Sequence, residues 1–320
     1  MILVFAESGE GKIKKAAREA VCYAANIAKA AGTSCTAVAM GEISADELSA
    51  LGKLGAEKVL HCSDSRLNNF DSQSYCKVMA EAANACEAQT VVLSFNYNGK
   101  SLGSRLSARL KAGLVSGATA LPNDGTTVKN VFSGKGLAHY KVNTSRKIIA
   151  VNPNTIQVVE GDGSATVEPL NVILEDGDFG VKVREVKKTS GSIPLTEAEL
   201  VVSGGRGLKG PEHFAMVDEL AGLLGAATAC SRAVADVDWR PHHEHVGQTG
   251  LTVRPNLYIA IAISGAIQHL AGVNSSKTIV VINIDPEAPF FKAADYGIVG
   301  DAFEVVPKLI EAVKNYQSQN

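Results

Sequence analysis

The chain has 320 residues, of which 46% are hydrophobic, 20% charged and 5% aromatic, and its formal net charge is −2. This length suffices for two domains with ordinary hydrophobic cores, and the composition is typical of a globular protein. The weak net charge and the few aromatic side chains argue against partners that need a basic field or a base-stacking surface, so we expect neither nucleic acid nor an anionic membrane as a partner.

The spacing of the cysteines bears on metal binding, and the lengths of the apolar runs bear on subcellular location. No two of the six cysteines stand at C-x-x-C spacing, which argues against a zinc or iron–sulfur site, and most fall on apolar faces where Cys acts as a small hydrophobe. No apolar run reaches the ~20 residues of a membrane span, and no signal peptide precedes the first strand. We therefore expect a cytoplasmic bacterial protein, or a mitochondrial matrix protein if the source is eukaryotic, without direct membrane insertion.

The first part of the chain alternates apolar strands with helices. The pattern predicts strands at Ile2–Glu7, Ser34–Met40, Lys58–Cys62 and Thr90–Phe95, and helices at Lys14–Ala31, Ala45–Leu54, Ser72–Cys86 and Lys100–Ala112. This alternation indicates a parallel sheet with helices on both faces. The segment Ser8–Lys12 contains Gly-x-Gly-Lys without the full P-loop spacing, so we interpret it as a solvated turn rather than a phosphate loop.

After Gly113 the sequence is richer in β-forming and turn residues. The pattern predicts strands or hairpins at Val128–Phe132, Leu137–Asn143 and Lys147–Val151, loops over Asn152–Ser164, and two further strands at Val167–Leu174 and Val181–Lys187. Thr189–Pro194 is the best candidate for a linker. We therefore predict a first domain over residues 1–190 and a second over residues 191–320.

The second domain is predicted to begin with a strand at Glu199–Ser203 and a glycine-rich turn, Gly204–Gly207. The glycines would let the backbone approach a ligand, and Arg206 could bind a phosphate or lie against an adenine. A helix is expected at Glu212–Leu224, followed by a strand at Ala227–Ala235 that carries Ser231 and Arg232. Because a charge inside an apolar strand is costly, Arg232 either faces a site at the strand's carboxyl end or pairs with Asp236, and we favour the first.

The stretch Leu257–Gly272 organises this domain. Its apolar run, Leu257–Ile263, predicts a buried parallel strand, and the sequence then breaks at Ser264-Gly265 before a helix begins. Unpaired N–H groups and the helix dipole make such a turn suited to a phosphate group. His269 lies about one turn further on, where it could still reach a ligand at the helix start.

Other polar segments lie before and after this stretch. For His242–His245 we weigh a metal site against a solvated loop, and we favour the loop because adjacent histidines point in different directions. Val246–Gly250 is predicted to be a turn that presents backbone and a hydroxyl to a flat ring. A strand at Thr278–Ile284 carries Asn283, which could bond a ribose. Asp301 could accept from an adenine amine or a ribose hydroxyl, and the closing helix is expected at Pro307–Tyr316.

One ordered set of motifs runs from about residue 199 to about residue 313. It comprises SGGRG, SRAVAD, VGQTG, LYIA-x-x-ISGAIQH-x-AG, DPEAP and ADYGIVGD, and it resembles the C-terminal region of the electron-transfer flavoprotein alpha subunit. Over the first ~190 residues the resemblance is one of layout only. Two features depart from the family pattern: Leu251 stands where the family often has Lys, and Trp239–His245 is unusually rich in His.

The resemblance implies two α/β domains, the second a doubly wound parallel sheet that binds FAD. It also implies an electron carrier that forms a heterodimer with a beta subunit carrying AMP, that takes electrons from dehydrogenases such as acyl-CoA dehydrogenases, and that passes them to a quinone-linked acceptor. The first domain would then be a surface for the partner subunit, without a ligand of its own. The flavin-binding residues that follow are Arg206, Ser231, Arg232, Val246, Gly247, Gln248, Thr249, Ser264, Gly265, Ala266, Ile267, Gln268, His269, Asn283, Asp301 and Ala302.

Within this set, Ser264 and Gly265 would hold the pyrophosphate, and Thr249 would bond flavin N5. His269 and Arg232 would favour the negative charge that develops near N1 and O2 on reduction. The other reading of His269 is a core histidine bonded to backbone. The sequence shows no nucleophile set, paired carboxylates or metal cluster, so we expect no catalytic residues of its own. Two alternatives remain at this stage: an NAD-binding subunit of a dehydrogenase or transhydrogenase-like complex, and a structural subunit with an empty site.

Overall fold

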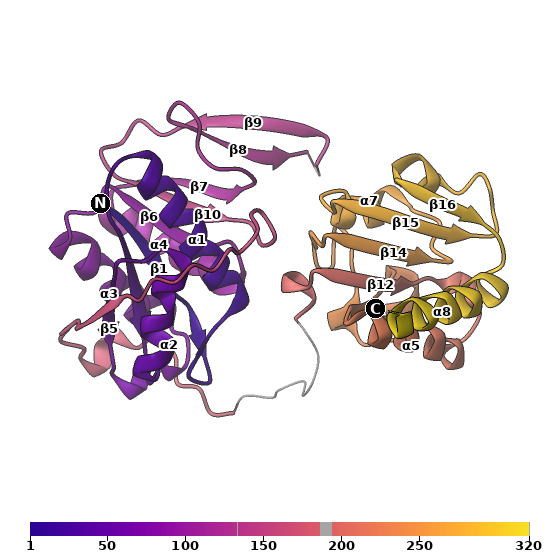
Figure 1. Ribbon diagram of the computed structural model, residues 1–320, viewed down its shortest axis with the longest axis horizontal. Helices are drawn as coiled ribbons and strands as arrows, with labels where there is room; N and C mark the ends of the chain where they lie inside the picture. The colour runs from indigo at the N-terminus through magenta and orange to yellow at the C-terminus, as the bar shows by residue number, and fades with distance from the viewer. Residues whose placement is uncertain (133, 186–193, 320) are drawn as a thin grey trace. The chain divides into compact units, whose positions relative to one another are not determined.

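The computed structural model describes residues 1–132, 134–185 and 194–319. The chain divides into two compact units, Met1–Lys188 and Thr189–Asn320, each built on a sheet of its own (Figure 1). The expected linker, Thr189–Pro194, lies outside the described residues except for Pro194. In the described part of the chain, no helix is long and apolar enough to cross a membrane.

A nine-stranded sheet forms the first unit. From β11 to β7 the neighbouring strands pair in parallel, whereas β7, β8 and β9 pair antiparallel. This arrangement confirms the expected parallel sheet with added strands. In spatial order the strands are β11 (Thr166–Pro169), β5 (Lys58–Cys62), β4 (Cys35–Met40), β1 (Ile2–Phe5), β6 (Thr90–Ser94), β10 (Lys147–Val151), β7 (Gly113–Ala118), β8 (Thr126–Val131) and β9 (Gly136–Lys141).

Helices cover both faces of this sheet. The core on one face includes α1 (Lys15–Ala30) and α2 (Ala45–Ser49), and the core on the other includes α3 (Ser72–Ala85) and α4 (Tyr97–Leu110). The central strands are buried on both faces, which explains their unbroken apolar runs. Helix α4 begins three residues before the predicted Lys100, because the Asn96 side chain caps it by accepting from the Gly99 N–H at 2.9 Å.

Two strand predictions for the end of the first unit need correction. The strand expected over Val167–Leu174 ends at Pro169, and residues 181–185 of the strand expected over Val181–Lys187 are exposed and irregular, while 186 and 187 lie outside the described residues. The pattern also missed β7, whose sequence GLVSGA has few strand-forming side chains. Strand β7 is held by parallel pairing with β10, some thirty residues away along the chain, so the local sequence carries little signal for it.

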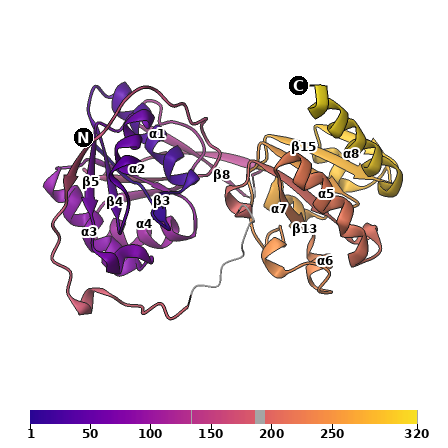
Figure 2. The ribbon, with the colours of Figure 1, turned by 60° about the horizontal axis from the view of Figure 1, so that its bottom comes forward.

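The second unit is a five-stranded, fully parallel sheet, which confirms the predicted doubly wound fold. Helices α5 (Ala215–Leu224) and α8 (Ala302–Gln319) lie side by side on one face (Figure 2), and α7 (Ile267–Val273) contributes to the core on the other face. The strand order is β13 (Ala227–Cys230), β12 (Leu200–Gly204), β14 (Leu257–Ile261), β15 (Thr278–Asn283) and β16 (Tyr296–Val299).

Several predicted boundaries differ in this unit. The strand expected over Ala227–Ala235 ends at Cys230, and a short helix, α6 (Arg232–Ala235), follows it. The helix expected from Glu212 is a 3-10 turn, Pro211–Phe214, continued by α5. Helix α8 begins at Ala302 rather than Pro307, because the Asp301 carboxylate accepts from the Phe303 N–H at 3.0 Å and caps the helix earlier.

Candidate functional site

The strand order of the second unit determines where a ligand can bind. From β12 the chain passes to β13 on one side and then returns to β14 on the other side, so β12 and β14 flank a topological switch point. In open parallel sheets of this order, ligands bind at the carboxyl ends of the strands beside that point. A cavity of about 670 Å³ lies there, and its walls come from the segments that follow β12, β13, β14 and β15.

The structure brings most of the predicted site residues together around this cavity. Gly265 and Ile267 belong to the same turn without lining the cavity, and Asp301 and Ala302 lie at the end of the neighbouring strand β16. The twelve that line it are Arg206, Ser231, Arg232, Val246, Gly247, Gln248, Thr249, Ser264, Ala266, Gln268, His269 and Asn283.

The turn between β14 and α7 has the predicted place, and its glycine also has a packing role. Gly265 has φ +80°, and a Cβ there would lie 2.5–2.6 Å from atoms of Phe290. The position therefore requires glycine so that the turn can pack on Phe290, and the predicted contact of Gly265 with a phosphate stays a prediction. Ser264, Ala266 and Gln268 line the cavity, and the first N–H groups of α7 have no partners within the helix.

The glycines of the turn after β12 likewise have packing contacts that the sequence did not predict. A Cβ on Gly205 would run into the carbonyl oxygen of Ala262, and Gly207 donates its N–H to that oxygen at 3.3 Å. Ala262 itself has φ +56°, an uncommon value for a residue with a side chain. The glycines thus allow the ends of β12 and β14 to pack together and shape the cavity wall, while Arg206 is exposed at its edge.

The turn Val246–Gly250 is attached directly to α7. Gln248 donates its N–H to the Gln268 carbonyl at 2.7 Å, and a Cβ on Gly272 would lie 2.6 Å from the Gly247 backbone. This close approach sets the position of the exposed side chains of Gln248 and Thr249 at the cavity. The predicted turn is therefore present and is fixed by backbone contacts.

Arg232 combines the two alternatives that the sequence left open. It follows the carboxyl end of β13 and lines the cavity, and it also donates from Nε to Asp236 Oδ2 at 3.2 Å. Its side chain is 62% exposed, so the charge resides in a solvated pair rather than in a strand interior. The argument that the charge of Arg232 lies inside an apolar strand was wrong, because residues 232–235 form helix α6 instead of the end of that strand.

His269 and His245 are buried in the wall of the cavity. The pKa of His269 is lowered to about 4, mainly by burial and also by the neighbouring His245, while the backbone of Val246 acts in the opposite direction. Burial is also the main cause that lowers the pKa of His245. Both rings are thus neutral at neutral pH. His269 Nδ1 has no hydrogen-bond partner among the described residues, although it is shielded from solvent.

The sequence reasoning missed His245, which it assigned to a solvated loop. His242 and His243 are exposed as expected, but the chain then pairs with the end of β13, where the Val246 N–H donates to the Cys230 carbonyl at 3.1 Å. The position of His245 directly before VGQTG was the available signal. In the described residues, no group of three or more His, Cys, Asp or Glu side chains is placed to hold a metal ion.

Asn283 and Asp301 both have structural partners. Asn283 is buried, donates from Nδ2 to the Ile263 carbonyl at 2.9 Å and accepts from the Asp285 N–H at 3.0 Å, so it holds the ends of β14 and β15 together. Asp301 caps α8 through one oxygen, and Ala302 is part of the core. The ribose and adenine roles of these residues stay predictions.

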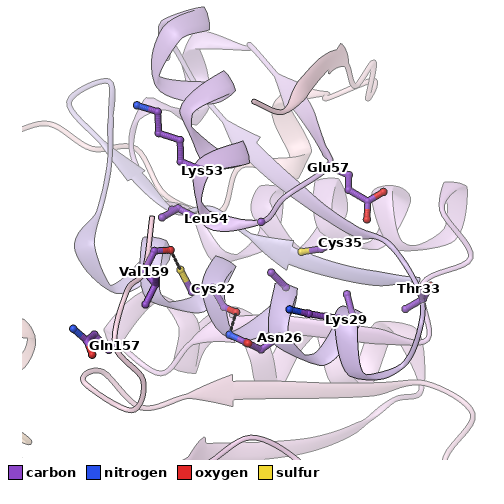
Figure 3. Close-up of a pocket in the computed structure, with 13 residues that line it drawn as sticks. Cys22, Asn26, Lys29, Thr33, Cys35, Lys53, Leu54, Glu57, Gln157 and Val159 are labelled. Atoms are coloured by element: carbon purple, nitrogen blue, oxygen red, sulfur yellow. Dashed lines mark hydrogen bonds between the residues drawn. The ribbon is translucent and has the colours of Figure 1, made fainter. Parts of the chain in front are cut away.

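The first unit has cavities of a different character. One of about 500 Å³ is bordered by Cys22 and Cys35, whose thiols have pKa values raised mainly by burial (Figure 3). Another, of about 710 Å³, borders the turn Ser8–Lys12, where Lys14 pairs with the buried Glu7 at 2.6 Å. With Glu7, Glu10 and Glu42 around it, this second cavity is acidic and unsuited to a phosphate. All six cysteines are free thiols.

Comparison with known proteins agrees with this geometry. Residues 2–174 match the family model described as electron transfer flavoprotein domain, and residues 194–274 match the model described as electron transfer flavoprotein FAD-binding domain. A Bacillus subtilis protein named electron transfer flavoprotein subunit alpha is 40% identical over 320 residues, covering 98% of this chain and 97% of that protein. The chain belongs to the electron-transfer flavoprotein alpha-subunit family.

Further members of this family show similar coverage. The protein of the same name from Syntrophomonas wolfei is 37% identical, covering 97% of this chain and 98% of that protein. Protein FixB from Clostridium saccharobutylicum is 36% identical, covering 98% and 96%. The resemblance inferred from the motifs is therefore confirmed, and it extends over both units rather than over the second alone.

The residues at the cavity fit a flavin dinucleotide. The cavity volume is within the range of small-molecule and cofactor sites. Arg206 and Arg232 supply positive charge for phosphate or for a reduced ring, and Asp236 is the one carboxylate among the lining residues. The unpartnered Nδ1 of His269 is a buried polar atom that a bound ligand would satisfy.

Proposed function

We propose that this chain is the FAD-binding alpha subunit of a heterodimeric electron-transfer flavoprotein, and that it works as an electron carrier. The observation that carries the proposal is the cavity at the β12–β14 switch point, where twelve of the residues predicted for flavin contact meet. Bound flavin would supply the redox chemistry, while the chain would bind, orient and electrostatically tune it.

Each side of the cavity suggests a role. Ser264, Ala266 and Gln268 at the start of α7 would hold the pyrophosphate, with Arg206 nearby. Thr249, on the turn attached to α7, would present its hydroxyl to flavin N5. His269 would donate a hydrogen bond to the ring, and Arg232 would add a screened positive charge.

The partners belong to the same proposal. A beta subunit carrying AMP would cover part of the first unit, dehydrogenases such as acyl-CoA dehydrogenases would donate electrons, and a quinone-linked oxidoreductase would accept them. We place the complex in the bacterial cytoplasm, or in the mitochondrial matrix if the source is eukaryotic. The exposed apolar side chains of Phe132, directly after β8, and of Leu137 and Tyr140 on β9 are consistent with a covered surface on the first unit.

The test is to purify the chain with its beta subunit and record the visible absorption. The proposal predicts the bands of oxidised flavin, which a dehydrogenase and its substrate should bleach. The chain expressed alone should bind flavin weakly or dissolve poorly. A colourless heterodimer that binds NAD instead would support the dehydrogenase or transhydrogenase-like alternative and would contradict the proposal.

A further inference from the structure

The starting observation is a contact behind the cavity wall. Tyr258 lies on β14 with its side chain fully buried, and its hydroxyl is 2.9 Å from Nε2 of His269 on α7. Phe290 packs near both rings, with centroids 6.3 Å from Tyr258 and 5.7 Å from His269. The hydroxyl–imidazole contact is therefore enclosed by apolar side chains and shielded from water.

Both partners are uncharged in this environment. Burial raises the pKa of Tyr258 far above its usual range, so the phenol keeps its proton. The buried imidazole is neutral as well, as described above, and therefore carries a single N–H. One of the two groups must donate to the other, and the choice decides which ring nitrogen of His269 has the proton.

The hydrogen-bond contacts favour the phenol as the donor. The phenol proton needs an acceptor, and the hydrogen-bond partner of the Tyr258 hydroxyl in the described part of the chain is His269 Nε2. The buried hydroxyl of Ser203, on the adjacent strand β12, makes no hydrogen bond there. If Nε2 donated instead, the buried phenol proton would have no acceptor, which is costly.

The other ring nitrogen then carries the proton. A neutral imidazole has a single N–H, so an unprotonated Nε2 leaves that proton on Nδ1. Nδ1 is buried and has no hydrogen-bond partner among the described residues, and His269 lines the cavity. The Nδ1–H is therefore left for a ligand to satisfy.

We propose that Tyr258 is a positioning residue that holds His269 as a neutral imidazole with its proton on Nδ1, so that the ring presents a fixed N–H donor to the bound flavin. This inference rests on the proposed flavin site. It assigns His269 the role of a neutral donor and leaves Arg206 and Arg232 as the permanent positive charges at the cavity. Tyr258 acts through His269.

The first test reads the proton position directly. Ring-nitrogen NMR of the heterodimer, with FAD removed and then restored, should show Nδ1 protonated and Nε2 unprotonated in both states, with the Nδ1 signal shifting when FAD binds. Tyr258→Phe keeps the packing but removes the donor, so it should give mixed tautomers. Ser203→Ala removes a buried hydroxyl on the same side of the sheet but leaves the Tyr258–His269 contact, and it should retain the wild-type tautomer.

The second test separates positioning from general damage to the core. Tyr258→Phe should lower the equilibrium constant for one-electron reduction of the flavin about three- to tenfold, a tenfold change being about 59 mV. In a His269→Asn background the same substitution should add no further shift, because its effect passes through the imidazole. Additive shifts in the two backgrounds would contradict the proposal.

The outcomes distinguish this inference from the proposed function. If the wild-type heterodimer binds no FAD, the function fails, while the tautomer can still be read in the flavin-free protein. If FAD binds but Nε2 is protonated, or Nδ1 does not respond to FAD, or Tyr258→Phe leaves both ring nitrogens unchanged, the inference is wrong and the function stands.

Discussion

Both units place the carboxyl ends of parallel strands at a cavity. The buried polar groups at the two cavities differ in whether they have hydrogen-bond partners within the protein. In the first unit, the buried Glu7 at the end of β1 accepts from Lys14, Asn96 and Asn98, each at 2.6 Å. In the second unit, His269 Nδ1 is buried without a partner among the described residues. We infer from the comparison that an open parallel sheet alone does not make a ligand site. The site arises where buried polar groups are left for a ligand to satisfy.

The largest expected effect is a loss of stability in the first unit, where the buried carboxylate of Glu7 has its partners within the protein. Glu7→Gln should destabilise that unit by about 3 kcal/mol, because a buried carboxylate with three partners is lost while Lys14 keeps its charge. The affinity for FAD should not change. Denaturant unfolding and a flavin titration would measure both, and Glu168→Gln in the exposed pair with Lys58 is the control, with an expected cost below ~1 kcal/mol. A large loss of FAD affinity in Glu7→Gln would contradict the view that FAD binding depends on the polar groups of the second unit and not on those of the first.

The buried His269 should make the second unit sensitive to acid. The unfolded chain takes up its proton near the ordinary pKa of 6.5 and the folded chain only near 4, so stability from this group is complete above pH 6.5 and is lost as the pH falls towards 4. The loss should reach about 2–3 kcal/mol, given about 1.4 kcal/mol per pKa unit. Unfolding of the flavin-free heterodimer at several pH values would measure it. His269→Asn should flatten this part of the profile, and an equally steep profile in that variant would assign the acid sensitivity to another group.

Gly272→Ala should break the contact between α7 and the turn Val246–Gly250. The added Cβ would meet the Gly247 backbone at 2.6 Å, so we expect a loss of about 2 kcal/mol in stability and roughly ten- to a hundredfold weaker FAD binding. Gly222, in the interior of α5, is the matched control because a Cβ there meets nothing within 4 Å. Gly222→Ala should be neutral or stabilising by about 0.5–1 kcal/mol. Equal FAD affinities in the two variants would show that the turn does not shape the site.

The smallest effect concerns Arg232. Its side chain is 62% exposed and paired with Asp236, so its influence on the flavin is screened. Arg232→Ala should lower the one-electron potential by about 1 kcal/mol, or roughly 40 mV, and Asp236→Asn should raise it. Spectroelectrochemical titration of both variants would decide this. Shifts of the same sign in the two variants would show that the charge of this pair does not act on the ring.

The sequence predicted what depends on local pattern and missed what depends on distant partners. Apolar runs predicted the central strands. The motif set predicted sixteen site residues, of which twelve line one cavity in the structure. Strand β7 went undetected because β10 supplies its pairing, and α6 was taken for strand because RAVAD has an apolar pattern that suits either. The packing contacts of Gly205 with Ala262 and of Gly265 with Phe290 could not be predicted, because these partners lie far away along the chain. His245 was missed for the same reason, since its burial follows from pairing of the chain with the end of β13.

The most direct test of the central claim is the crystal structure of the heterodimer with FAD bound. The account predicts the flavin dinucleotide in the cavity at the carboxyl ends of β12 and β14, with its pyrophosphate beside Ser264–Gln268 and its ring beside His269 and Thr249. FAD bound instead beside Glu7 in the first unit, or held only by the beta subunit, would contradict it.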